Sequence, residues 1–74
     1  MSFVLEFKSD ACCGGYIHAE VEHANGVRSI VEEVAPGQYN VQTLQHNAQA
    51  APWGQGLTMD QVQARLASDA LIPA

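Results

Sequence analysis

The chain has 74 residues, 47% of them hydrophobic and 15% charged, which allows one domain with one thin core and excludes a two-domain enzyme. Eight acidic residues against three basic ones give a formal net charge of −5, so the chain lacks the basic surface that free duplex DNA requires. We therefore expect a single acidic domain over residues 1–74 and no direct nucleic-acid partner.

The first residues do not have the pattern of a targeting segment. Glu6 and Lys8 interrupt the apolar residues, no basic segment precedes them, and no apolar run approaches the roughly 18 to 20 residues of a membrane helix. The two cysteines, Cys12 and Cys13, are adjacent and cannot join distant parts of the chain. We expect a reduced, cytoplasmic protein with no membrane partner.

Alternating apolar residues predict a strand near the start of the chain. Phe3, Leu5 and Phe7 alternate with other residues, which is typical of a half-buried strand at about residues 2–8. Residues 9–15 have turn composition and include Gly14 and Gly15, so we expect the chain to reverse there. A second strand follows at about residues 16–24.

A second turn is predicted at Asn25-Gly26, because this dipeptide tolerates the positive φ values of a two-residue hairpin loop. Residues 27–34 also show apolar residues at helical spacing, but β-branched residues and the flanking turns favour a third strand. Pro36-Gly37 then separates it from a fourth strand at about residues 39–46.

A helix is predicted at about residues 59–71, after a long connection that carries Trp53. Thr58 and Gln61 have the spacing of a capping box, and Pro73 prevents the helix from continuing. One narrow apolar stripe runs along it, made of Met59, Val62, Leu66 and Ala70.

The turns also predict which side chains share a face of the sheet. A two-residue loop at Asn25-Gly26 places Ala24 opposite Val27, and a four-residue loop fixes the next hairpin. The predicted buried set is Phe3, Leu5, Phe7, Ile17, Ala19, Val21, Ile30, Val34, Tyr39 and Val41. We expect the helix and Trp53 to cover this face. Glu32 does not fit the set, and either the sheet margin or a bulge must turn it outward.

Together these elements predict an α+β fold. It is a four-stranded antiparallel β-meander, with one C-terminal α-helix packed on one face.

The opposite face is predicted to be polar and acidic, with His18 directly across from Glu33. Carboxylates and amides on an exposed sheet face suit recognition of a basic protein surface, although an ordinary solvated face has the same pattern, and charge alone favours that simpler interpretation. The candidate binding residues are His18, Glu20, Glu22, Glu33, Asn40 and Gln42.

No metal or cofactor is expected. Cys12, Cys13, His18 and His23 are close in sequence, but adjacent cysteines point apart and the two histidines would lie on opposite faces of a sheet.

No catalytic set is expected either. The thiols have no basic neighbour nearer than Lys8, and Gly54 and Gly56 lack the preceding strand and the lysine of a phosphate loop. A pairing of either thiol with His18 or His46 stays open, but one sheet and one helix offer little concavity for a catalytic pocket. We expect that the protein is not an enzyme.

The sequence therefore predicts a small non-enzymatic protein-binding module, an accessory subunit or inhibitor. It would bind a protein with a basic surface through the acidic face, or pair through its first strand, which could also form a homodimer. One alternative is small-ligand or metal binding at the Cys12-Cys13-Gly14-Gly15 loop with His18. Another is an acidic mimic that competes for a nucleic-acid-binding protein.

Overall fold

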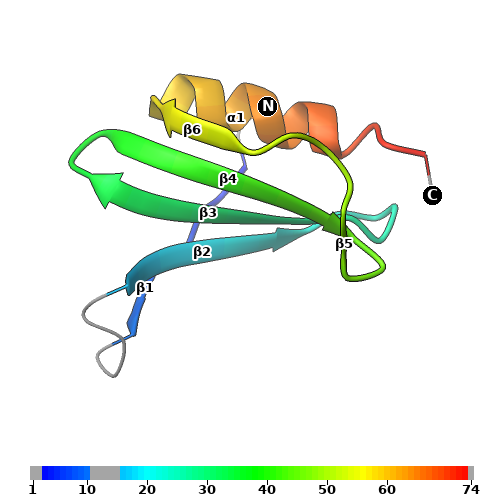
Figure 1. The fold of residues 1–74 in the computed structure, drawn as a ribbon, viewed down its shortest axis with the longest axis horizontal. Coiled ribbons are helices and arrows are strands. Elements are labelled where there is room, and N and C mark those ends of the chain that lie inside the picture. Colours follow the sequence, from blue (N-terminus) through cyan, green and yellow to red (C-terminus); the bar gives the residue numbers. More distant parts are fainter. Residues whose placement is uncertain (1–2, 11–15, 74) are drawn as a thin grey trace.

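An antiparallel sheet with one C-terminal helix across one side forms the protein (Figure 1). A computed structural model describes residues 3–10 and 16–73. The elements are β1 (Lys8–Asp10), β2 (Tyr16–Glu22), β3 (Arg28–Ala35), β4 (Gln38–Gln45), β5 (Ala48–Gln49), β6 (Gly54–Leu57) and α1 (Met59–Asp69). The predicted α+β fold is confirmed, and the described sheet has six strands instead of four.

The two additional strands, β5 and β6, lie in the predicted long connection and pair with β4. Strand β4 is therefore an inner strand, whereas the predicted four-stranded meander would make its fourth strand an edge of the sheet. These strands were missed because they are short and their residues do not alternate between apolar and polar. Backbone pairing holds β6, which places Tyr39 opposite Leu57 and Val41 opposite Gly54.

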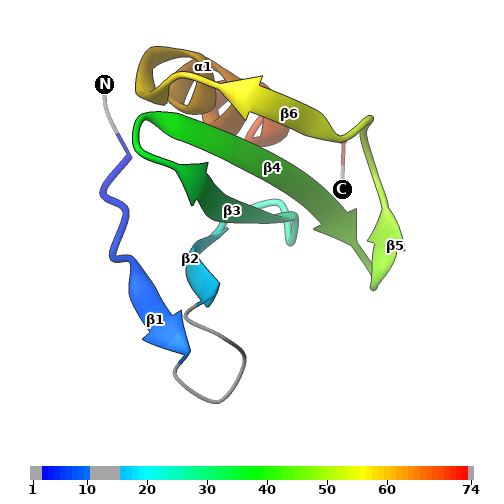
Figure 2. The same cartoon turned by 60° about the vertical axis from the view of Figure 1, so that its left-hand side comes forward.

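The N-terminal residues differ from the predicted strand at residues 2–8, of which the structure describes Phe3 onward. Pairing begins only at Lys8, opposite His18, so β1 has three residues. The segment before it is bound to the helix: the amide side chain of Gln63 accepts a hydrogen bond from Phe3 N at 2.6 Å and donates one to Phe3 O at 3.0 Å. Figure 2 shows this segment running from beside α1 to β1. Its alternation reflects packing of Phe3 and Leu5 on the core.

The hairpin of β2 and β3 has a three-residue loop instead of the predicted two-residue loop. His23 lies opposite Val27, because His23 N donates to Val27 O at 2.8 Å and Gly26, at φ 85°, follows in the left-handed region. Asn25 explains this choice, since its side chain accepts from Val27 N at 3.0 Å and donates to Ile72 O at 2.8 Å. A tertiary contact with the end of the chain therefore shifts the register of β2 and β3 by one residue.

The pairing of β3 and β4 is also shifted by one residue from the prediction. Glu33 lies opposite Tyr39, and an irregularity at Val34 separates this pair from the turn. Because the pairing is displaced by one residue in both hairpins, the faces predicted for β4 are correct and the two faces of β3 are exchanged. Strand β3 therefore turns the side opposite to the predicted one toward the helix. Residues Val27, Ser29 and Val31 are buried.

The predicted buried set is therefore wrong in β3 and at Phe7, which is 36% exposed. Elsewhere Ala19 and Val41 are buried, and the remaining residues of the set are half-buried. Ile30 is half-buried on the face opposite the helix, and Val34 is 46% exposed. Glu32 no longer conflicts with the pattern, because the true register places it on the uncovered face. Trp53 is also misplaced by the prediction, since it is 51% exposed and lies on the side away from the core.

The core forms where α1 packs on β3 and β4. Its fully buried centre consists of Val31, Val41, Val62 and Leu66. The predicted capping box is confirmed: Gln61 N donates to Thr58 Oγ1, and Thr58 N donates to the Gln61 side chain at 2.8 Å. Partly buried residues surround the centre, namely Phe3, Leu5, Val21, Tyr39, Leu57 and Met59.

One carboxylate, Asp69, lies buried between the end of α1 and the sheet, at 1% exposure. It accepts hydrogen bonds from Ser29 Oγ at 2.6 Å, Thr43 Oγ1 at 2.8 Å and Arg65 Nε at 3.1 Å. The predicted apolar stripe assigned this place to Ala70, which is exposed. The carboxylate thus joins the helix to both central strands and satisfies their hydroxyl groups.

We expect Asp69→Ala to lower the free energy of unfolding by about 3–5 kcal/mol, because it leaves the Arg65 guanidinium and two buried hydroxyl groups without their acceptor. Urea unfolding followed by circular dichroism measures this change. Asp60→Ala is the control, since this exposed carboxylate in the first helical turn contributes at most about 1 kcal/mol. Equal losses for the two variants would contradict a stabilising role for the buried carboxylate.

Candidate functional site

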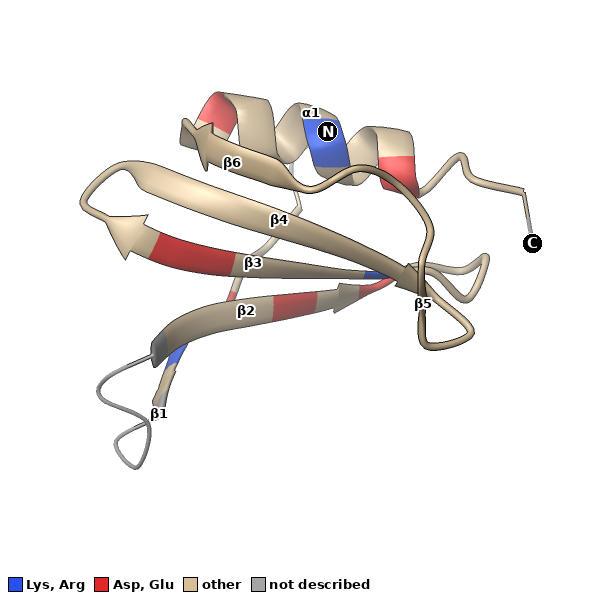
Figure 3. Cartoon of the chain, viewed as in Figure 1, with Lys and Arg blue, Asp and Glu red and all other residues tan. Residues whose placement is uncertain are grey.

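The face of the sheet away from α1 carries a polar surface built from three strands. Cross-strand pairing aligns three rows of side chains on this face: His18 with Glu32 and Asn40, Glu20 with Ile30 and Gln42, and Glu22 with Arg28 and Leu44. We call these nine residues the open face. Figure 3 shows acidic residues along β2 and β3, the strands that contribute most of its charge.

The structure brings together all the predicted binding residues except Glu33. Residues His18, Glu20, Glu22, Asn40 and Gln42 belong to the open face, because the parity of β2 and β4 was assigned correctly. Glu33 shares the parity of buried Val31 and lies beside Tyr39 on the helix side. His18 is therefore opposite Glu32, not Glu33.

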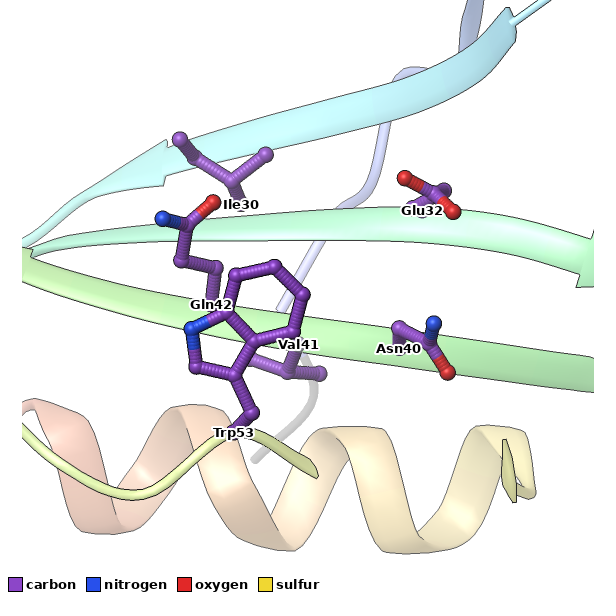
Figure 4. A pocket seen from close by; sticks show the side chains of 6 residues that line it. All are labelled: Ile30, Glu32, Asn40, Val41, Gln42 and Trp53. Atoms are coloured by element: carbon purple, nitrogen blue, oxygen red, sulfur yellow. The ribbon is translucent and has the colours of Figure 1, made fainter. Parts of the chain in front are cut away.

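Trp53 adds an aromatic ring to the open face. Its indole lies over β4 beside the Gln42 side chain and Ile30 (Figure 4), and the residue is 51% exposed. The preceding residue fixes its position, since Arg65 Nη2 donates to the carbonyl oxygen of Pro52 and the following Gly54 pairs with Val41. No alternation of apolar and polar residues predicts on which face of the sheet Trp53 lies. Its position on the open face follows only from the pairing of β6 with β4.

A shallow hollow separates Trp53 from the carboxylate of the neighbouring row. Its lining consists of Ile30, Glu32, Asn40, Val41, Gln42 and Trp53 (Figure 4). The volume open to the centre of a water molecule is about 20 Å³, which is room for one water, whereas pockets for small molecules hold several hundred Å³. The hollow is therefore too small to enclose a small molecule, and only the end of one side chain of a larger partner could lie over it.

The open face keeps a negative charge that the chain does not neutralise. Of the chain's three basic residues, Arg65 is bound to Asp69, and Arg28 lies 3.4 Å from Glu20 and 3.2 Å from the Asn47 side chain. The third, Lys8, lies opposite His18 at the margin of this face and forms no ion pair with a described residue. Within residues 3–10 and 16–73, no ion pair engages Glu32 or Glu22. Carboxylates on this face are thus available to a cationic partner.

Serine, histidine and aspartate meet in the interior but not in a catalytic order. Ser29 Oγ donates its proton to Asp69, so the 2.8 Å contact with His23 Nε2 requires the histidine to donate to the serine oxygen. A general base would have to accept that proton instead. Because Ser29 is fully buried as well, the cluster holds the strands and helix together and offers no nucleophile to a substrate.

The ligand and metal hypothesis concerns residues that the structure mostly does not describe. Cys12, Cys13, Gly14 and Gly15 lie outside the described residues, whereas His18 stands on the open face. Among the residues that are described, no group of three or more histidine, cysteine, aspartate or glutamate side chains could hold a metal ion.

Comparison with protein-family models, with curated proteins and with solved structures found no match. The helix in the described part of the chain has 11 residues and could not cross a membrane.

Removing the Glu33 carboxylate should lower the pKa of Tyr39. Partial burial raises the pKa of this phenol above 10.0, and the negative charge of Glu33 and its hydrogen bond raise it further. We expect the pKa to fall in Glu33→Gln while staying above 10.0, as measured by the ultraviolet absorbance of tyrosinate with Tyr39→Phe subtracted. Stability from the protonated phenol is present below pH 10.0 and is lost as the pH rises through the folded-state pKa. An unchanged pKa in Glu33→Gln would contradict the contact.

Proposed function

We propose that the protein is a non-enzymatic binding module that recognises a basic protein surface through its open face. The observation that supports this most directly is the combination of an exposed tryptophan with two carboxylates, Glu22 and Glu32, that form no ion pair among the described residues. A partner would bring the missing positive charge. The role would be that of an accessory subunit or an inhibitor.

The arrangement resembles the centre of a protein interface. Tryptophan is enriched among the residues that dominate binding energy, and such residues are surrounded by a polar rim. Here Trp53 and half-buried Ile30 form the apolar centre, and charged and amide side chains surround them. Charge on the rim raises the rate of encounter and selects partners of opposite sign.

Charge reversal on the open face tests this proposal. Proteins from a lysate of the protein's own cells are captured on the wild type and on Glu20→Lys/Glu22→Lys. We expect the double variant to retain about tenfold less of the partner, because like charges then face its basic surface. The proteins retained are compared by mass spectrometry at low and high salt. Binding that weakens steeply with salt favours the acidic mimic, since nucleic-acid-binding grooves are the most basic partners.

The control is Glu33→Lys/Asp60→Lys, which changes the net charge by the same amount away from the open face. Both double variants are first shown to be folded by their thermal unfolding. If the two lose the same partners to the same extent, total charge and not the open face governs binding, and the proposal is wrong.

A second contact is proposed at the sheet edge. Strand β1 ends the described sheet, and the residues before it include Val4 at 83% exposure and Phe7 at 36%. A second copy pairing along this edge would cover both side chains. We expect a dimer at tens of micromolar by light scattering after size exclusion, and a monomer for Val4→Lys/Phe7→Lys. If the wild-type protein stays monomeric at these concentrations, the proposed pairing of two copies along β1 is wrong.

Binding of a small ligand or metal at residues 12–15 with His18 stays a prediction, as does a cytoplasmic location. No described residue outside His18 bears on the first.

A further inference from the structure

We propose that the hollow beside Trp53 binds an arginine side chain of the partner, with its guanidinium stacked on the indole and paired with Glu32. This inference rests on the proposed function and specifies the group that the open face recognises.

The indole supplies the first half of this site. Trp53 is half-exposed, and its ring forms one side of the hollow (Figure 4), while the backbone on either side of it is held by the hydrogen bond of Arg65 to Pro52 and by the pairing of Gly54 with Val41. Backbone that is already held loses little conformational freedom on binding. Tryptophan has the most favourable π face for a cation, and a planar guanidinium stacks on it.

The carboxylate of Glu32 supplies the second half. It lines the same hollow, is half-buried, and has no ion-pair partner in the part of the chain that the structure describes. The nearest basic residue along β3, Arg28, is engaged by Glu20 and Asn47 instead. A carboxylate partly withdrawn from water attracts a cation more strongly than one on a fully exposed surface.

The amide side chains distinguish arginine from lysine. Gln42 lies beside the indole and offers a carbonyl oxygen, while Asn40 has its oxygen occupied by Gly56 N at 3.1 Å. A guanidinium has several donors in one plane, so it can reach a carboxylate and an amide oxygen while stacked. An ammonium is a compact, strongly hydrated point charge, so it cannot stack as a plane on the indole while donating to both oxygens.

Intrinsic fluorescence tests the proposal directly, because Trp53 is the single tryptophan of the chain. The 74-residue chain is titrated at low salt with the peptide acetyl-Gly-Ser-Arg-Ser-Gly-amide. Matched peptides carry lysine or citrulline in place of arginine, citrulline being the neutral isostere. We expect a saturable change with a millimolar dissociation constant for arginine, about threefold weaker binding for lysine and about tenfold weaker binding for citrulline.

Adjacent glutamates on β3 provide the matched protein variants. Glu32→Gln and Glu33→Gln make the same chemical change in neighbouring residues, but only the first lines the hollow. We expect Glu32→Gln to weaken the arginine peptide about tenfold and Glu33→Gln to leave its affinity within about twofold. Circular dichroism and thermal unfolding confirm that each variant is folded before titration.

Three results would overturn the arginine site: no saturable change with the arginine peptide, equal binding of arginine and citrulline, or equal losses in the two glutamine variants. Lysine bound as well as arginine would overturn the stacked geometry. None of these results decides the broader proposal, which the charge-reversal capture tests with different residues. Conversely, if charge reversal does not affect capture but the arginine peptide binds, the arginine site stands and the proposed partner recognition is wrong. The failure of one proposal can therefore be told apart from the failure of the other.

Discussion

The buried carboxylate of Asp69 is the interaction on which the arrangement of helix and sheet depends. A carboxylate without water is tolerated only when its oxygens are satisfied, and here Ser29, Thr43 and Arg65 supply the donors. These partners come from both central strands and from the helix itself. The apolar core of valine and leucine side chains is non-directional, whereas this set of hydrogen bonds has one geometry, so it selects one position of the helix along the sheet.

The same network determines what the opposite side of the sheet presents. Arg65 binds Asp69 with one nitrogen, and with another it binds Thr43 and the carbonyl oxygen of Pro52. The chain then passes from the helix side around β4, and the next residue, Trp53, lies on the open face. A buried structural contact thus positions the exposed side chain that is central to the proposed binding surface.

Sequence reasoning predicted the fold class, the capping box and the parity of β2 and β4, since these depend on local patterns. It failed in β3 because Asn25 bonds to carbonyl groups near the end of the chain, and this contact selects a loop one residue longer than the dipeptide alone favours. A one-residue shift exchanges the two faces of a strand. Glu32 therefore replaced Glu33 in the candidate site, and Trp53 was missed because β6 has no periodic signal.

The contacts of Asn25 also bear on the order of events during synthesis. Its amide donates to the carbonyl oxygens of Asp69 and Ile72, more than forty positions later in the chain. While the nascent chain lacks these acceptors, the hairpin of β2 and β3 has only its own turn to align it, and the alternative pairing with a two-residue loop competes. Contacts with residues at the end of α1 and just beyond it thus favour the alignment that buries Val31 and leaves Glu32 on the open face.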